Sequence, residues 1–223
     1  MTTAREDILN KLRAATVKAP FADVPVHEAE PRQPVTKIDG DAAALRARFI
    51  AEVERVRGVV HPAENDAEAK RILINLLQQK EAKCVTMWDE LPVFVADDIR
   101  VLGIDRLRGQ MRELADADVG ITGAACAIAA TGTLVLEMGE GRSRAASLLP
   151  PVHVALVSAN QLVPRLEDYI AQQRAKGLPA FREGSNVVLL TGASRTADIE
   201  MNVVYGVHGP LELHIILIET PDP

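Results

Sequence analysis

The sequence predicts an α/β fold in which a mostly parallel sheet is flanked by helices and preceded by an N-terminal helical arm. After residue 39, segments with apolar residues at helical spacing alternate with short apolar runs of strand length, an order typical of βαβ units. The last run, residues 211–218, is apolar on both sides, as in a strand whose two faces are both covered. With 223 residues, 48% of them hydrophobic, the chain can bury a sizeable core.

The N-terminal arm is predicted over residues 1–38. Residues 5–16 place apolar side chains at helical spacing behind two acidic residues, which favours an amphipathic helix. Residues 17–38 contain four prolines and little periodicity, as in a linker or a surface arm. We therefore expect this arm, whose helix could dock on another subunit of a homo-oligomer, and a single α/β domain over residues 39–223.

The elements expected in the domain follow from the same patterns. Helices are expected from Asp39 or Asp41 to Gly58, from Asn65 or Asp66 onward, and over residues 160–176, closed by Gly177. Strands are expected over residues 59–60, 84–88, 133–138, 152–158, 187–191 and 211–218. Residues 89–117 are expected to be irregular, with one short helix around residues 111–115.

Composition argues against several classes of function. A net charge of −6, no basic face in either half and 3% aromatic residues argue against a nucleic-acid partner. No apolar run approaches the roughly 18–20 residues that span a bilayer. The N-terminus is charged and amphipathic, unlike a signal peptide. We therefore expect a cytoplasmic protein with no membrane span.

Motifs for metals and cofactors are missing from the sequence. Two cysteines, Cys84 and Cys126, are too few for an iron–sulfur cluster or a cysteine-based zinc site. No H-E-x-x-H pair occurs, and the glycines match neither the dinucleotide fingerprint nor the P-loop. No G-x-S-x-G elbow marks a serine hydrolase. We therefore expect no metal site and no cofactor on this chain.

Four polar loops near the ends of predicted strands are the candidate ligand site. They are residues 120–124, 130–133, 191–200 and 205–210. In open α/β sheets, ligands bind outside the carboxyl ends of the strands, where glycine lets backbone N–H groups approach an anion. A single Thr-Gly pair is more often only a turn, but together the loops predict a cradle for a carboxylate or a phosphate. The candidate ligand-binding residues are Thr122, Gly123, Thr131, Gly132, Thr133, Ser194, Arg195 and Thr196.

The polar cluster after residue 193 allows two interpretations. Ser194 or Thr196 could cap a helix that has Asp198 and Glu200 in its first turn. Alternatively, Arg195 is a bidentate clamp for a carboxylate beside that helix N-terminus. The sequence does not choose between the cap and the clamp.

The candidates for acid–base chemistry are His208, Asp198 and Glu200. His208 lies where a loop meets the last predicted strand, and imidazole is suited to proton transfer or to polarising a ligand. His153 and His214 lie within predicted strands and are expected to be structural.

Five motifs, in this order, resemble the LUD-domain family in its lactate utilization protein C branch. The matching segments are residues 120–124, 127–136, 147–153, 191–200 and 206–210. The resemblance covers the C-terminal half strongly and the opening helix with its Pro-rich arm loosely. Each motif is weak alone, but five in order within about a hundred residues are specific.

The resemblance implies a fold like that of the NagB/RpiA/CoA-transferase superfamily. It also implies a role in the bacterial oxidation of L-lactate to pyruvate alongside iron–sulfur partner proteins. The family usually carries Glu directly before Thr-Gly-Thr, whereas this chain has Ala130, so a general base at that position would be missing here. Because no redox cofactor motif is visible, the electron-carrying centres of such a reaction would lie on the partners.

Three functions follow as hypotheses. The first is a component of a lactate-oxidising complex that binds a small carboxylate through residues 131–133, Arg195 and neighbouring hydroxyls, with His208 polarising the ligand. The second is a stand-alone enzyme on a phosphosugar, a CoA thioester or a similar anionic metabolite. The third is a non-catalytic scaffold or regulator whose N-terminal helix binds partners. The sequence leaves open whether the site is catalytic.

Overall fold

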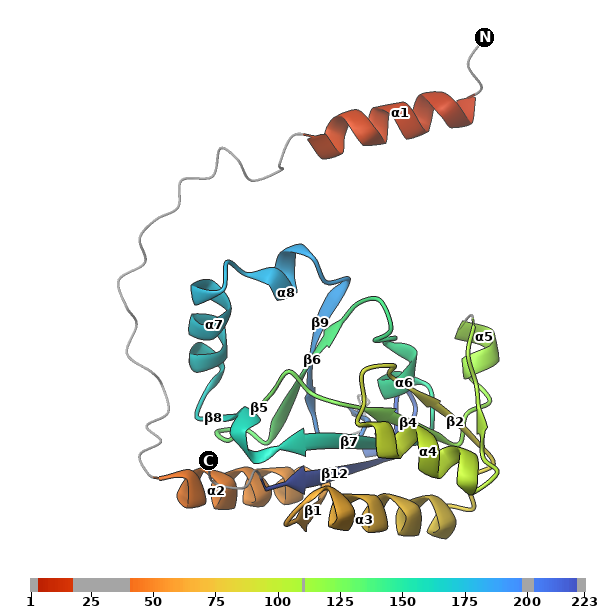
Figure 1. The fold of residues 1–223 in the computed structure, drawn as a ribbon. Helices are drawn as coiled ribbons and strands as arrows, with labels where there is room; N and C mark the ends of the chain where they lie inside the picture. Colours follow the sequence, from red (N-terminus) through yellow and green to blue (C-terminus); the bar gives the residue numbers. More distant parts are fainter. Residues whose placement is uncertain (1–3, 18–40, 110, 198–202, 220–223) are drawn as a thin grey trace. The chain divides into compact units, whose positions relative to one another are not determined.

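The computed structural model describes residues 4–17, 41–109, 111–197 and 203–219 (Figure 1). The chain divides into two units, residues 1–35 and residues 36–223, which are described separately. In the first unit, α1 (Ala4–Val17) begins with acidic residues in its first turn. It exposes Ile8 and Leu12, which lie one helical turn apart on the same side. The rest of the predicted arm lies outside the described residues.

A six-stranded parallel sheet forms the centre of the second unit, in the order β1-β12-β7-β4-β2-β3. Its strands are β1 (Val59–Ala63), β2 (Cys84–Met87), β3 (Asp105–Arg106), β4 (Val119–Thr122), β7 (Val152–Ser158) and β12 (Glu212–Ile218). The predicted fold class, a mostly parallel sheet flanked by helices, is confirmed. The segment expected to be covered on both faces forms β12, which lies inside the sheet and is almost wholly buried.

Helices cover both faces of this sheet (Figure 1). They are α2 (Ala42–Arg55), α3 (Asp66–Gln79), α4 (Val93–Val101), α5 (Met111–Leu114) and α6 (Ala145–Leu148). One face packs against α3 and α4, which contribute Leu73 and Ile99 to its apolar cluster. The opposite face packs against α2 through Phe49 and Val53. Alternate residues of β7 and β12 therefore enter two separate apolar layers, as the period of two in a strand requires.

A second, four-stranded sheet has the order β8-β5-β6-β9. Its strands are β5 (Cys126–Ile128), β6 (Thr133–Met138), β8 (Leu162–Val163) and β9 (Asn186–Thr191). Strand β6 pairs antiparallel with both β5 and β9. One face joins the α2 layer through Leu134 and Leu136, and the other packs on Tyr169 of α7 (Leu166–Ala175). The remaining elements are η1 (Ala159–Gln161), α8 (Pro179–Arg182) and the hairpin of β10 (Arg195–Ala197) with β11 (Val203–Tyr205).

Two expected segments are wrong in detail. Instead of one helix over residues 160–176, the chain forms η1 and β8 before α7 begins at Leu166. Pro164 explains the break, since proline disfavours helical backbone at the residue before it. Residues 89–117, expected to be irregular, contain α4 directly after Pro92. Its opening β-branched residues hide the helical pattern, because valine has low helix propensity.

Within the described segments, none of the helices combines the length and apolar character needed to cross a membrane.

Candidate functional site

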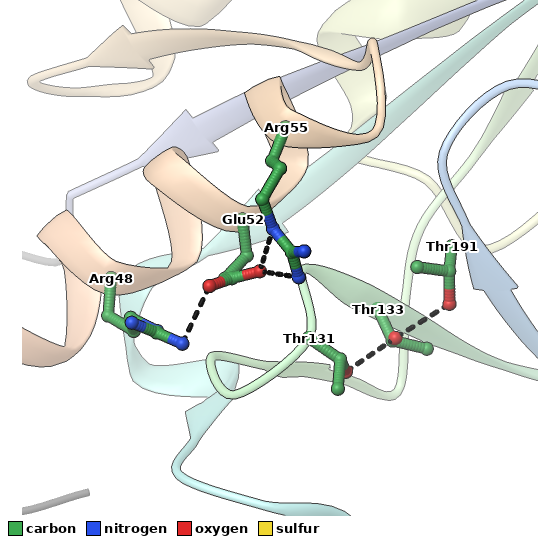
Figure 2. Close-up of polar contacts among 6 residues, drawn as sticks. All are labelled: Arg48, Glu52, Arg55, Thr131, Thr133 and Thr191. Carbon is green, nitrogen blue, oxygen red and sulfur yellow. Dashed lines mark hydrogen bonds and ion pairs between the residues drawn. The ribbon is translucent and has the colours of Figure 1, made fainter.

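Three threonine hydroxyls from two strands of the smaller sheet form a hydrogen-bonded chain, which we call the hydroxyl chain (Figure 2). Thr133 opens β6 and lies in register with Thr191, the last residue of β9. Its Oγ1 is 2.7 Å from that of Thr191 and 2.7 Å from that of Thr131. Three hydroxyls carry three hydrogens, of which two serve the internal bonds. One O–H is therefore left to donate outward, away from the other two hydroxyls, and both end residues are exposed.

Gly132 brings the hydroxyl chain against α2. Its φ is +62°, a backbone conformation that glycine adopts without strain. A Cβ at this position would lie 2.6 Å from the backbone nitrogen of Val53 and 2.7 Å from the carbonyl carbon of Glu52. Only glycine therefore lets the turn between β5 and β6 approach the helix backbone so closely.

Glu52 of α2, whose backbone lies against the turn at Gly132, holds two guanidinium groups, which we call the arginine pair (Figure 2). Its carboxylate is buried, with Oε1 2.6 Å from Nη2 of Arg48. The other oxygen accepts from Nε of Arg55 at 2.7 Å and from its Nη2. The two arginine side chains are 50% and 71% exposed, and each guanidinium has five N–H donors. The buried carboxylate thus orients two cations that keep donors for an external anion.

A cavity of about 280 Å³ adjoins the hydroxyl chain, whose three threonines line it together with Ala130. Arg165 also lines it, and Asp168 holds its guanidinium through two hydrogen bonds of 3.0 and 3.2 Å. The alanine that replaces the glutamate expected from the resemblance therefore lies in the wall of this cavity.

A second cavity, of about 390 Å³, is lined by Ser194, Arg195, Thr196 and His208. It adjoins the first, because Leu189 and Thr191 line both. The backbone of Ser194 is fixed by the carbonyl of Pro210, which accepts from its N–H at 2.9 Å. The structure therefore gathers four predicted residues here and places the hydroxyl chain beside them. Arg195 and His208 are exposed, and Ser194 and Thr196 are half-buried.

This second cavity lies at the amino ends of the parallel strands. The residues that line it include Ser147, before β7, and Pro210, before β12. The expectation that the polar loops gather at the carboxyl ends of the parallel strands is therefore wrong for this group. Residues 206–210 lead into β12, and residues 192–194 follow β9, which belongs to the other sheet. The helix-cap interpretation of residue 194 is also wrong, since Arg195–Ala197 forms a strand paired with β11. Asp198 and Glu200, predicted as acid–base residues, lie outside the described residues.

Thr122 and Gly123 lie elsewhere, at the end of β4. Thr122 is fully buried, and its Oγ1 is 2.9 Å from Nε2 of His153. Burial lowers the pKa of His153 to about 4, so the imidazole is neutral at physiological pH and the pair belongs to the core. Gly123 lines a separate cavity at the carboxyl ends of the parallel strands.

The other groups singled out in the sequence have structural partners. His214 lies 3.0 Å from Nε2 of His61 and 3.0 Å from Oε2 of Glu212. Hydrogen bonds from Lys80 and His214 lower the pKa of the Glu212 carboxyl. Burial raises the pKa of Cys126 to about 12, so its thiol is not a nucleophile at neutral pH. Across the described ranges, no cluster of three or more His, Cys, Asp or Glu side chains could hold a metal ion.

Sequence reasoning missed the arginine pair and the glutamate between its members. A signal for them exists in the helix itself. Phe49, Val53 and Val56 form the apolar stripe of α2, and Glu52 falls within that stripe at helical spacing. A carboxylate in a buried stripe needs partners, and arginines four residues before it and three after it can provide them.

The fold and site define a class: an α/β domain with a parallel sheet, an attached antiparallel sheet, and polar loops between them. The chain belongs to the LUD-domain family, whose family model matches residues 46–218. A crystal structure of a DUF162 family protein from Deinococcus radiodurans is similar in fold. Its TM-score is 0.64 with 26% sequence identity, over 81% of this chain and 99% of that one.

Curated relatives agree with this assignment. Lactate utilization protein C of Halalkalibacterium halodurans is 34% identical over 154 residues, which make up 65% of this chain and 66% of the relative. Lactate utilization protein C of an Exiguobacterium species is 41% identical over 108 residues, 48% of this chain and 47% of the relative. The chain thus spans about half to two thirds of the length of these relatives.

Proposed function

We propose that this protein is a component of an L-lactate utilization system, in which it binds a small carboxylate while iron–sulfur partner proteins carry the electrons. Membership of the LUD-domain family and relatives named lactate utilization protein C support this role. The oxidation of lactate to pyruvate releases two electrons, and the sequence carries no motif for a redox cofactor. The chain therefore handles the carboxylate, and the redox step belongs to the complex.

The hydroxyl chain beside the arginine pair is the observation that carries the binding proposal. A guanidinium is a planar fork whose parallel N–H donors match the two oxygens of a carboxylate. Glu52 already orients the guanidinium of Arg55, so less side-chain entropy is lost when a ligand binds. The outward O–H of the hydroxyl chain supplies a further donor. Arg195, Ser194, Thr196 and His208 would extend the site through the adjoining cavity.

Ligand titration tests the site. Wild-type protein is titrated with L-lactate and with pyruvate by isothermal calorimetry, beside the variants Thr131→Val and Arg55→Gln. We expect both variants to bind at least about tenfold more weakly, since a charge-assisted hydrogen bond contributes roughly 1.5–3 kcal/mol. Arg71→Gln is the matched control, because Arg71 also pairs with a glutamate three residues earlier, but on α3. Unchanged affinity in folded Arg55→Gln and Thr131→Val would overturn the site.

Turnover assays test whether the chain needs iron–sulfur partner proteins for lactate oxidation. The purified chain is assayed for lactate oxidation alone and after mixing with iron–sulfur proteins of a lactate-oxidising complex. We expect no turnover by the chain alone and turnover only in the mixture. Lactate oxidation by the isolated chain would contradict a role as carboxylate-handling component and favour a complete enzyme.

A further inference from the structure

A separate cavity of about 240 Å³ lies at the carboxyl ends of the parallel strands. Trp88 follows β2, Gly123 follows β4, Ser158 ends β7 and Ile218 ends β12, and all four line it. It shares no lining residue with the two cavities around the hydroxyl chain. This edge is where open parallel sheets bind their ligands, and we call the space the carboxyl-end cavity.

Most polar side chains of its wall are already satisfied by neighbours. Gln161 accepts from the Ser158 N–H at 2.7 Å and donates to the Ala124 carbonyl at 2.5 Å. The Ser158 side chain accepts from the backbone of Gln161. The indole N–H of Trp88 donates to the carbonyl of Ser143 at 3.1 Å. These bonds hold the polar groups of the wall in place, and Leu91 and Leu156 add apolar surface beside them.

Arg142 is the exception in this wall. It follows β6 in a turn closed by two backbone hydrogen bonds to Gly139, at 3.1 and 3.3 Å. Its Nε is buried and has no hydrogen-bond partner within the part of the chain that the structure describes. The one ion pair that Arg142 forms within those residues is with Glu90, whose Oε2 lies 3.8 Å from its Nη1 and whose side chain is 64% exposed. Leaving a buried donor unsatisfied is costly, so the guanidinium would gain from a shift that brings this donor to a ligand oxygen in the cavity.

We propose that the carboxyl-end cavity binds a small monocarboxylate with an apolar tail, whose carboxylate is held by Arg142. The guanidinium offers its N–H fork to two carboxylate oxygens, and the tail lies against the apolar wall formed with Trp88, Leu91 and Leu156. The proposal rests on this cavity alone and does not depend on a role in lactate utilization.

Charge and size define the ligand class. Glu90 and Glu137 are the other charged residues of the wall, so with Arg142 its formal charge is negative. This charge repels a dianion such as phosphate about twice as strongly as a single carboxylate, so among anions the wall favours a monoanion that Arg142 can pair. The cavity is also smaller than the roughly 300–1,000 Å³ of sites for drug-sized ligands. The geometry thus fits an acid with a tail of a few carbon atoms.

A homologous ligand series tests the proposal on the full chain. Acetate, propionate, butyrate and valerate are titrated by calorimetry, beside inorganic phosphate and n-butylamine. We expect affinity to rise roughly three- to fourfold for each added CH₂ until the tail fills the cavity. Phosphate lacks the tail and n-butylamine lacks the carboxylate, so both should bind at least about tenfold more weakly than butyrate. Absence of saturable butyrate binding at millimolar concentrations, or phosphate binding as tightly as butyrate, would overturn the proposal.

Variants in and beside the turn after β6 test whether Arg142 holds the carboxylate of the ligand. Arg142→Gln should weaken butyrate binding at least about tenfold, whereas Arg144→Gln, an exposed arginine two residues later, should leave it unchanged. Gly139→Ala is a second probe that keeps the charge, because the added methyl would lie 3.3 Å from Nη2 of Arg142 and shift the guanidinium by a few tenths of an ångström. Weaker binding in Gly139→Ala supports the proposal even where Arg142→Gln unfolds. Full butyrate affinity in folded Arg142→Gln, or in Gly139→Ala, contradicts it.

Discussion

The two sheets use similar threonines in opposite ways. Thr122, in the six-stranded sheet, is fully buried and its hydroxyl is bonded to His153, which is also fully buried. Thr133, in the four-stranded sheet, is almost as buried, but its partners Thr131 and Thr191 are both exposed. Both faces of the parallel sheet are covered, whereas β9 ends the smaller sheet with half of its residues exposed. Coverage of the sheet, rather than the local Thr-Gly motif, therefore decides whether a hydroxyl can meet a ligand.

The largest effect is expected when one methyl group is added to the six-stranded sheet, whose two faces are both covered. A Cβ at Gly120 of β4 would lie 1.7 Å from the carbonyl oxygen of Ala146 in α6. We expect Gly120→Ala to lower the free energy of unfolding by about 3–5 kcal/mol, since the interior has no room to yield. Chemical denaturation measures the change. Gly103→Ala is the control, because its φ is +68° but nothing lies within 4 Å of the added carbon; it should cost only about 1–2 kcal/mol. Equal losses in the two variants would mean that α6 does not clamp the sheet.

The pH dependence of stability tests the burial of His153. Its folded pKa is about 4, below the ordinary value of 6.5, because of desolvation. As the pH falls below about 6.5, the unfolded chain binds a proton that the folded protein does not, so stability is lost between about pH 6.5 and pH 4. Between pH 7 and pH 5 the wild type should lose about 2 kcal/mol more than His153→Asn, which cannot titrate.

Denaturation at the two pH values measures that difference. His61→Asn serves as comparison, because burial and His214 lower the pKa of His61 as well, but that residue is only half-buried. We expect a smaller effect there. Parallel pH profiles of wild type and His153→Asn would show that His153 is hydrated in solution, and the contrast between the two sheets would fail.

The sequence predicts more of the parallel sheet than of the site. Apolar runs mark residues 133–138 and 152–158 as strands, and β6 and β7 have those bounds. The same runs carry no signal for which sheet each strand joins, because backbone pairing between distant segments depends on tertiary packing. Thr191 meets Thr133 only through the register of β9 with β6. The glutamate that orients the arginine pair lies on a helix about eighty residues before β6 and more than 130 before β9, so short-range spacing could not reveal its place beside them.

A less severe test removes one hydroxyl from the core. Thr122→Val keeps the volume of the side chain but leaves Nε2 of His153 without its partner. Nδ1 of the same ring already has none among the described residues. We expect a loss of about 1–2 kcal/mol, the cost of a buried unsatisfied polar group. Urea denaturation at pH 7 measures it, and no loss would mean that water reaches this ring.

The smallest expected change in stability comes from the matching substitution in the smaller sheet. Thr133→Val removes the middle of the hydroxyl chain, but Thr131 and Thr191 are exposed and can bond to water instead. We expect the free energy of unfolding to change by no more than about 0.5 kcal/mol, because an exposed hydroxyl exchanges one partner for another. Affinity for L-lactate should nevertheless fall about three- to tenfold, since the outward O–H loses the neighbour that orients it. A loss of stability as large as that of Thr122→Val, with lactate affinity unchanged, would assign these threonines to the fold alone.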